Sequence, residues 1–170
     1  DDHPVTGTSG SLIEGFVGTR RWAEEASGAE LSLTLISRRS RHRAGTRYIK
    51  RGMGPDSAVA NCVETEQLLH FQGHSLSLVQ LRGSVPLFWA QPGYRYRPPP
   101  RLTADKTRSL PVFSTHLDTC AETYGSPLVM VNLVNQCGSE HLIGSAFLDH
   151  VLSADRPDVV FAAFDFHEHC

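Results

Sequence analysis

The second half of the chain alternates amphipathic segments with almost wholly apolar ones, and this alternation restricts the possible folds more than any other feature. Residues 111–125 are amphipathic, begin at a proline and end at Gly125, which predicts a helix. Residues 140–153 place Leu, Ile, Val and Phe side chains on one helical stripe, which predicts a second helix. Residues 128–134 and 158–166 are nearly all apolar, as expected of strands covered on both faces. The order α-β-α-β therefore predicts parallel strands that lie next to or near each other in one sheet.

The first half of the chain is predicted to consist mainly of strands. Residues 31–37 and 74–81 alternate apolar and polar side chains with period two. Further short strands are expected at residues 12–17 and 85–91. Residues 58–69 fit either a loose helix or a strand, and we favour the strand.

The remaining segments complete the expected architecture. Residues 1–10 are polar and Gly-rich and are expected to be disordered, and a turn of helix is expected around Trp22–Ala26. Residues 94–102 must be extended, because three successive prolines exclude a helix. The prediction is one α/β domain over residues 11–170, with a mixed central β-sheet flanked by helices.

Composition excludes several classes of protein. The chain has 170 residues, 40% of them hydrophobic, and a formal net charge of -2, so it can form a folded core. No apolar run approaches the ~20 residues that a membrane-spanning helix needs. The four cysteines form no C-x-x-C pair and there is no Asn-x-Ser/Thr acceptor, which favours an intracellular protein with reduced thiols.

A strongly basic segment stands out in this mildly acidic chain. Its seven basic side chains are separated by no acidic residue, and small serine, alanine and glycine residues between them would leave the backbone open to a phosphate. The alternatives are a solvated loop and a nucleic-acid contact, the latter less favoured because Tyr48 is the only aromatic residue there to stack on bases. The seven residues are Arg38, Arg39, Arg41, Arg43, Arg47, Lys50 and Arg51.

Three other candidate sites carry structural alternatives. Residues 167–170, His-Glu-His-Cys, could bind zinc, but no second ligand cluster completes a site, so we favour structural hydrogen bonds and expect no metal. Glu64 and Glu66 would share one face of a strand, where they could do acid/base chemistry but more often pair with nearby arginines. None of the four cysteines has an arginine six positions later, so no cysteine-phosphatase loop is present, and there is no G-x-S-x-G elbow or Walker A loop.

Several stretches together resemble the Sac domain of phosphoinositide phosphatases. They are LTLISRRSRHRAGTRYIKRG, VANCVETEQ, LVQLRGSVPLFWAQ, VNLVNQCGSEHLIG and FDFHEHC, in the order and spacing of that family. GYRYRPPPRL and FDFHEHC look most like the endosomal branch known as inositol polyphosphate phosphatase F, whereas the synaptojanin and endoplasmic-reticulum branches look like weaker matches.

The resemblance implies an enzyme class and a division of the chain. Family members remove phosphate monoesters from phosphoinositides, chiefly the 4-phosphate in this branch, through a cysteine nucleophile in a Cys-x5-Arg loop and without a cofactor or metal. That loop lies downstream of FDFHEHC in the family, so we expect residues 11–170 to be a truncated N-terminal portion of the catalytic domain, inactive alone, in which Cys170 is not the nucleophile.

The resemblance also implies partners for the basic segment. We expect its seven basic residues, together with Arg82, to contact phosphoinositide headgroups or an anionic membrane surface, on endosomal or other intracellular membranes. Some of these arginines could instead be partners of Glu64 and Glu66. The rival functions are a non-catalytic lipid-binding fragment and a nucleic-acid-binding module.

Overall fold

A computed structural model describes residues 12–23, 30–46, 48–93 and 98–164 of the chain. The chain divides into two compact units, which are described separately. The first unit comprises Asp1–Ala44 and Asn61–Gly83, and the second comprises Gly45–Ala60 and Ser84–Cys170. The lead-in expected to be disordered, residues 1–10, lies outside the described residues.

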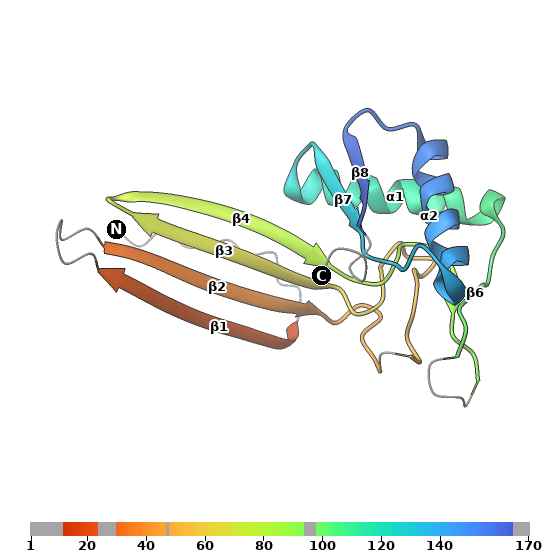
Figure 1. Cartoon of the computed structure of the whole chain (residues 1–170), viewed down its shortest axis with the longest axis horizontal. Coiled ribbons are helices and arrows are strands. Elements are labelled where there is room, and N and C mark those ends of the chain that lie inside the picture. The colour runs from red at the N-terminus through yellow and green to blue at the C-terminus, as the bar shows by residue number, and fades with distance from the viewer. Residues whose placement is uncertain (1–11, 24–29, 47, 94–97, 165–170) are drawn as a thin grey trace. The chain divides into compact units, whose positions relative to one another are not determined.

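The first unit is a four-stranded antiparallel sheet with the order β1-β2-β3-β4, which follows the chain from one edge to the other (Figure 1). Gln72 and Gly73 join β3 to β4 with φ values of 48° and 78°. Two successive positive φ angles are typical of the tight hairpin turns that match strand twist. The strands are β1 (Leu12–Ala23), β2 (Glu30–Ser40), β3 (Val63–Phe71) and β4 (His74–Arg82).

The sheet confirms the strands predicted in this half and corrects their bounds. β1 continues to Ala23, which pairs with Glu30, so the expected helical turn is wrong at Trp22 and Ala23, and the rest of that turn lies outside the described residues. The strand interpretation of residues 58–69 is confirmed from Val63 onward. Its first residues form a turn instead, because Asn61 adopts a φ of 55°.

The second unit contains the predicted helices and the parallel strand pair (Figure 1). β7 pairs directly with β8 in parallel, which confirms the predicted α-β-α-β order and its adjacent strands. The expected strand at 85–91 is reduced to β5, which pairs with β6. The elements are β5 (Trp89–Ala90), β6 (Arg101–Leu102), α1 (Lys106–Tyr124), β7 (Leu128–Asn132), the 3-10 turn η1 (Gly138–Glu140), α2 (His141–Ala154) and β8 (Val159–Ala163).

The start of α1 differs from the predicted one. Asp105 is the N-cap, and its side chain accepts a hydrogen bond of 2.9 Å from the backbone N–H of Arg108. The helix therefore begins at Lys106, and Pro111, which we expected to open it, lies within it. The capping aspartate satisfies an otherwise unpaired N–H at the helix end and so fixes the true start.

The core of the second unit forms where α1, α2 and β8 meet. Phe113 of α1 contacts Phe147 of α2 edge-to-face with centroids 6.1 Å apart, and Phe147 contacts Phe161 of β8 at 5.3 Å. Beside them the buried His150 ring lies 2.5 Å from the Ser109 hydroxyl, and its Nδ1 donates to the Ala146 carbonyl. Aromatic contacts of this kind join the two helices and the strand into one layer.

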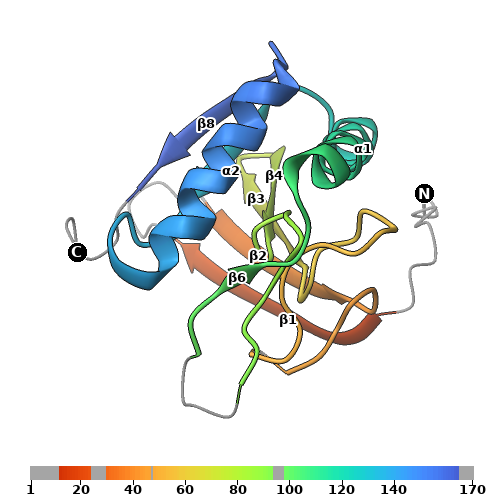
Figure 2. The ribbon, with the colours of Figure 1, turned by 90° about the vertical axis from the view of Figure 1, so that its right-hand side faces the viewer.

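Among the described residues, one face of the β7–β8 pair is covered and the other is exposed. Leu128 and Met130 are half-buried, whereas Val129 and Val131 are 65% and 56% exposed and Val160 is 52% exposed. Both helices lie to one side of β8 (Figure 2). The expectation that these strands are covered on both faces is therefore wrong here. The mixed α/β content is confirmed, with the described strands distributed over three sheets.

Candidate functional site

The basic segment is divided between the two units. Arg38 and Arg39 lie near the end of β2, and Arg41 and Arg43 follow in the turn. These four belong to the first unit, together with Arg82 at the end of β4. Lys50 and Arg51 belong to the second unit, and Arg47 lies outside the described residues. The described members of the basic segment, although close in sequence, therefore do not belong to one structural element.

Arg38 is held by the two carboxylates that sequence analysis paired with the basic segment. Its Nη1 donates to Glu64 Oε1 at 2.7 Å and its Nη2 donates to Glu66 Oε2 at 3.1 Å. Burial acts to lower the pKa of Arg38, but hydrogen bonds to Glu66 and Glu64 outweigh it and raise that pKa above its usual value. Glu64 and Glu66 lie on one strand face, as predicted, and their role here is structural pairing.

Arg39 and Arg82 lie on the opposite face of the same sheet. Successive side chains of a strand point to opposite faces, and residues directly opposite on neighbouring strands share a face. Arg39 pairs with Val63, which pairs in turn with Arg82, so the two arginines flank one position. Arg39 Nη2 donates to Asn61 Oδ1 at 2.7 Å, and Arg82 is exposed.

The turn after β2 is held by backbone N–H groups that donate to a distant carbonyl and to a serine side chain. The Ser40 N–H donates to the Cys62 carbonyl at 2.8 Å, and the His42 N–H reaches the Ser40 hydroxyl at 3.2 Å. Arg43 adopts a φ of 50°, which reverses the chain direction. Arg41 and His42 are exposed at this turn, which places Arg41 where an anionic ligand could reach it.

Arg51 is anchored within the second unit. Its Nε donates to Gln91 Oε1 at 2.6 Å, and its guanidinium lies 5.2 Å from the Tyr48 ring centroid and 5.3 Å from that of Trp89. Cation–π contacts of this geometry stabilise a half-buried arginine. Lys50 is exposed. Extending the predicted strand beyond Ser37 would have placed the side chains of Arg38 and Arg39 on opposite faces. No signal in the sequence predicts the partners of Arg51.

Cys120, within α1, lies beside a histidine but is not an activated thiolate. The Cys120 Sγ lies 3.8 Å from His116 Nε2, one helical turn away. Burial raises the pKa of the Cys120 thiol and lowers the pKa of His116, so both groups favour their neutral forms. Among the described residues no group of three His, Cys, Asp or Glu side chains could hold a metal ion, and residues 167–170 lie outside them.

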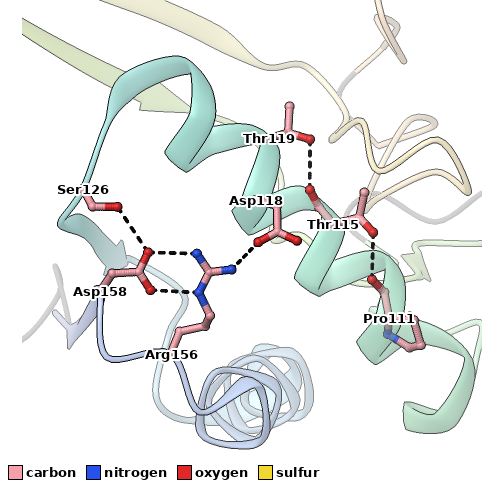
Figure 3. A network of polar contacts seen from close by, with 7 residues as sticks. All are labelled: Pro111, Thr115, Asp118, Thr119, Ser126, Arg156 and Asp158. Atoms are coloured by element: carbon pink, nitrogen blue, oxygen red, sulfur yellow. Dashed lines mark hydrogen bonds and ion pairs between the residues drawn. The ribbon is translucent and has the colours of Figure 1, made fainter.

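A second polar cluster lies beside α1 (Figure 3). Arg156 donates twice to Asp158, at 2.8 Å from Nε and 2.8 Å from Nη2, and also contacts Asp118 of α1. Ser126 donates to Asp158 at 3.2 Å, and hydrogen bonds from Arg156 lower the pKa of Asp158. The guanidinium is saturated by carboxylates, so this cluster ties α1 to the start of β8 and offers no open anion site.

Comparison with known proteins identifies the family. Residues 4–170 match the SacI homology domain. The chain belongs to the SacI homology domain family. The Sac resemblance predicted from the sequence is thereby confirmed.

The similar curated proteins are Sac phosphatases. The chain is 53% identical over 139 residues to phosphatidylinositide phosphatase SAC2 of Danio rerio, covering 82% of this chain and 12% of that protein. It is 50% identical over 138 residues to SAC2 of Homo sapiens, covering 81% of this chain and 12% of that protein. For phosphatidylinositol-3-phosphatase SAC1-B of Danio rerio the identity is 39% over 160 residues, covering 94% of this chain and 27% of that protein.

The chain corresponds to a small part of its relatives. The chain spans about an eighth of the length of the SAC2 relatives. Within the described residues, no helix combines the length and apolar character needed to cross a bilayer. The family assignment therefore applies to the domain to which these residues belong, and the activity of the whole protein is treated below as a proposal.

Proposed function

We propose that the chain is part of a phosphoinositide phosphatase that hydrolyses phosphate monoesters of phosphatidylinositol phosphates, above all the 4-phosphate. The observation that carries this proposal is the match of residues 4–170 to the SacI homology domain, with about half of the aligned residues shared with proteins named phosphatidylinositide phosphatase. The nucleophile in this proposal is a cysteine outside these 170 residues, since no cysteine among them begins a Cys-x5-Arg motif.

The basic residues have different roles in this proposal. Arg38 and Arg51 act structurally, because carboxylates hold the first and Gln91 with two aromatic rings holds the second. The exposed Arg41, Lys50 and Arg82 attract phosphoinositide headgroups or an anionic membrane surface. Each basic residue near such a surface contributes roughly 1 kcal/mol, and the contribution falls as salt is added. The protein acts in this proposal as a peripheral protein on endosomal or other intracellular membranes.

The first experiment measures phosphate release and vesicle binding together. The chain is incubated with liposomes carrying phosphatidylinositol 4-phosphate, and sedimentation of the liposomes is followed in parallel. We expect salt-sensitive binding without phosphate release above that of a heat-treated sample. Release by the chain alone would overturn the placement of the nucleophile outside these 170 residues, and substitution of each of the four cysteines would then test them as nucleophiles.

A non-catalytic lipid-binding protein is the second candidate, and the absence of a Cys-x5-Arg motif from these residues favours it. The full-length gene product distinguishes the two. Turnover of phosphatidylinositol 4-phosphate in preference to the 3-phosphate and 5-phosphate isomers supports the phosphatase. Binding of the same lipids with no turnover supports the second candidate.

A further inference from the structure

The four-stranded sheet of the first unit has two chemically different faces. Strand alternation and pairing register assign each residue of β1 to β4 to one of them. The face that carries Arg39 is here named the apolar face, and the face that carries Arg38 is named the ion-pair face. From edge to edge, two successive rows of the apolar face are Trp22, Leu31, Phe71 and His74, then Arg20, Leu33, Leu69 and Leu76.

The apolar face leaves large hydrophobic side chains in contact with solvent. The exposed fractions are 60% for Phe16, 46% for Trp22, 43% for Phe71, 65% for Leu76 and 56% for Leu78. They surround the half-buried leucines of β2. The ion-pair face also exposes Val17, Val79 and Leu81, but none of its described strand residues is Trp, Phe or Tyr. A patch that combines exposed aromatic rings and leucines marks an interaction surface.

The charges on the apolar face are almost all positive. Arg20, Arg39 and Arg82 lie on it, and by register Glu14, opposite Arg39, is its only acidic position in the described strands. The ion-pair face holds Glu64 and Glu66 instead. The alternation of each strand has therefore placed Glu64 and Glu66 on the face opposite the exposed aromatic side chains.

We propose that the apolar face docks on an anionic membrane surface, with Trp22, Phe16 and the β4 leucines entering the interfacial region and the arginines contacting lipid phosphates. Tryptophan prefers the membrane interface, and arginine stems lie along apolar surface while their charged ends reach headgroups. Apolar insertion and electrostatic attraction add for a surface of this composition. The proposal extends the proposed function. It rests on that function for the statement that the membrane carries the lipid substrate.

A second copy of the chain is the competing occupant, and charge disfavours it. Stacking two apolar faces would bring Arg20, Arg39 and Arg82 of one copy near the same residues of the other, with only one acidic position on each face to offset them. Like charges enclosed in an interface oppose association. An anionic bilayer instead supplies the opposite charge along the whole face.

The chain supplies its own reporter for the test. It has two tryptophans, and only Trp22 lies on the apolar face, whereas Trp89 belongs to β5 of the second unit. A Trp89→Phe variant makes Trp22 the sole tryptophan and keeps an aromatic ring beside Arg51. The probe is a vesicle of phosphatidylcholine and phosphatidylserine without phosphoinositide. We expect the Trp22 emission to shift to the blue on binding and to be quenched by brominated acyl chains.

Two matched substitutions on opposite edge strands separate the faces. Leu78→Glu places a carboxylate on the apolar face of β4, and Val17→Glu places one on the ion-pair face of β1, at sites that are 56% and 68% exposed. Both add one negative charge to the same fold, whose integrity is checked by circular dichroism. We expect Leu78→Glu to lower vesicle affinity at least about tenfold, the loss of one buried leucine, and Val17→Glu to change it much less.

The outcomes distinguish this proposal from the proposed function. Equal effects of the two substitutions, or an unshifted and unquenched Trp22 on bound vesicles, overturn docking through the apolar face. Concentration-dependent dimerisation that Leu78→Glu abolishes, with no vesicle binding, assigns the face to a second copy. A full-length protein that shows no phosphatase activity while the chain still inserts Trp22 refutes the proposed function and leaves the docking face standing.

Discussion

Gly52 occupies a position that only glycine fits. It has a φ of +67°, and a Cβ there would lie 2.5 Å from the Leu87 carbonyl oxygen and 2.8 Å from that of Trp89. Its N–H donates to the Ser84 hydroxyl at 2.8 Å, and its carbonyl accepts from the Ala60 N–H at 2.8 Å. Backbone strain and close packing therefore act together at this residue.

We expect Gly52→Ala to lower the free energy of unfolding by at least about 2 kcal/mol, because a positive φ costs an L-residue about 1–2 kcal/mol before any clash is added. The matched control is Gly138→Ala in the same unit, where φ is +72° and nothing lies within 4 Å of a built Cβ. Urea unfolding measures both variants. A Gly52→Ala loss no larger than the control's would show that the close contacts relax freely.

His116 predicts a pH dependence of stability. Its Nδ1 donates to the Ser57 carbonyl at 3.0 Å, and burial lowers its pKa below the usual value of 6.5 in spite of that hydrogen bond. Below pH 6.5 the unfolded chain therefore binds a proton at this residue more readily than the folded chain. Stability from this source is complete above pH 6.5 and is lost as the pH falls towards the folded pKa.

We expect the melting temperature of the native chain to fall more between about pH 7.5 and about pH 5.5 than that of His116→Gln, whose amide can still donate to the Ser57 carbonyl. Because the other histidines are unchanged, the difference between the two slopes isolates His116. Parallel slopes would contradict the assigned role of burial.

At the scale of elements, the ion pairs of Arg38 join β2 to β3. Removing the guanidinium would leave Glu64 and Glu66 side by side, with side chains only 27% and 22% exposed. We expect Arg38→Gln to cost about 1–2 kcal/mol of unfolding free energy, the range for charge-assisted hydrogen bonds that are partly screened. Vesicle affinity should change little, because Arg38 lies on the ion-pair face.

Changing the glutamates to glutamine in the Arg38→Gln chain should recover part of this loss, since the unpaired charges are then gone. Arg21→Gln is the control, an exposed arginine on the same face, with an expected change within about 0.5 kcal/mol. A loss in Arg38→Gln that the glutamine changes leave untouched would point to packing of the arginine stem instead.

Hydrophobic periodicity, together with glycine and proline positions, predicts the presence of the helices and strands better than the residues at which they begin and end. The strand at 74–81 and the helix at 140–153 were found within one residue, because one has strict alternation and the other a clear apolar stripe. The predicted start of α1 is wrong because Pro111 resembles a helix-start signal, although Asp105 carries the cap. The extension of β1 was missed because pairing with β2, rather than local composition, determines it.

The candidate site could be predicted only in part. Sequence analysis identified the basic residues and included the alternative that Glu64 and Glu66 pair with arginines among them. The structure shows that Arg38 is the arginine that pairs with both. Sequence could not divide the segment between two units, because that division depends on long-range contacts. The lipid-binding roles of the remaining basic residues stay predictions.

At the scale of the whole molecule, the two units differ in how much they bury. All the fully buried side chains of the described residues lie in the second unit, among them Phe113, Leu117, Ile143 and Phe147. The first unit relies on its hydrogen-bonded ladder and half-buried leucines. Segments with few buried apolar contacts open at lower free energy than packed cores.

We therefore expect hydrogen exchange to be faster in the first unit. Amides of β1 and β4, the edge strands, should exchange before those of α1 and α2, and peptide-resolved mass spectrometry measures the order. Vesicles of phosphatidylserine should slow exchange in β1 and β4 if the apolar face docks on them. Uniform protection across both units would mean that the sheet is as stable as the helical core.

The alternation along β2 has a consequence for how this sequence can vary between species. Deleting one residue such as Thr34 would move Arg38 to the apolar face and place Arg39 opposite the glutamates. Every residue after the deletion would then point to the other face of the sheet. Substitutions can accumulate one site at a time in such a strand, but a change of length alters all of them at once. Orthologous genes should therefore keep their codon count constant through β2 and place insertions in the turn that follows it.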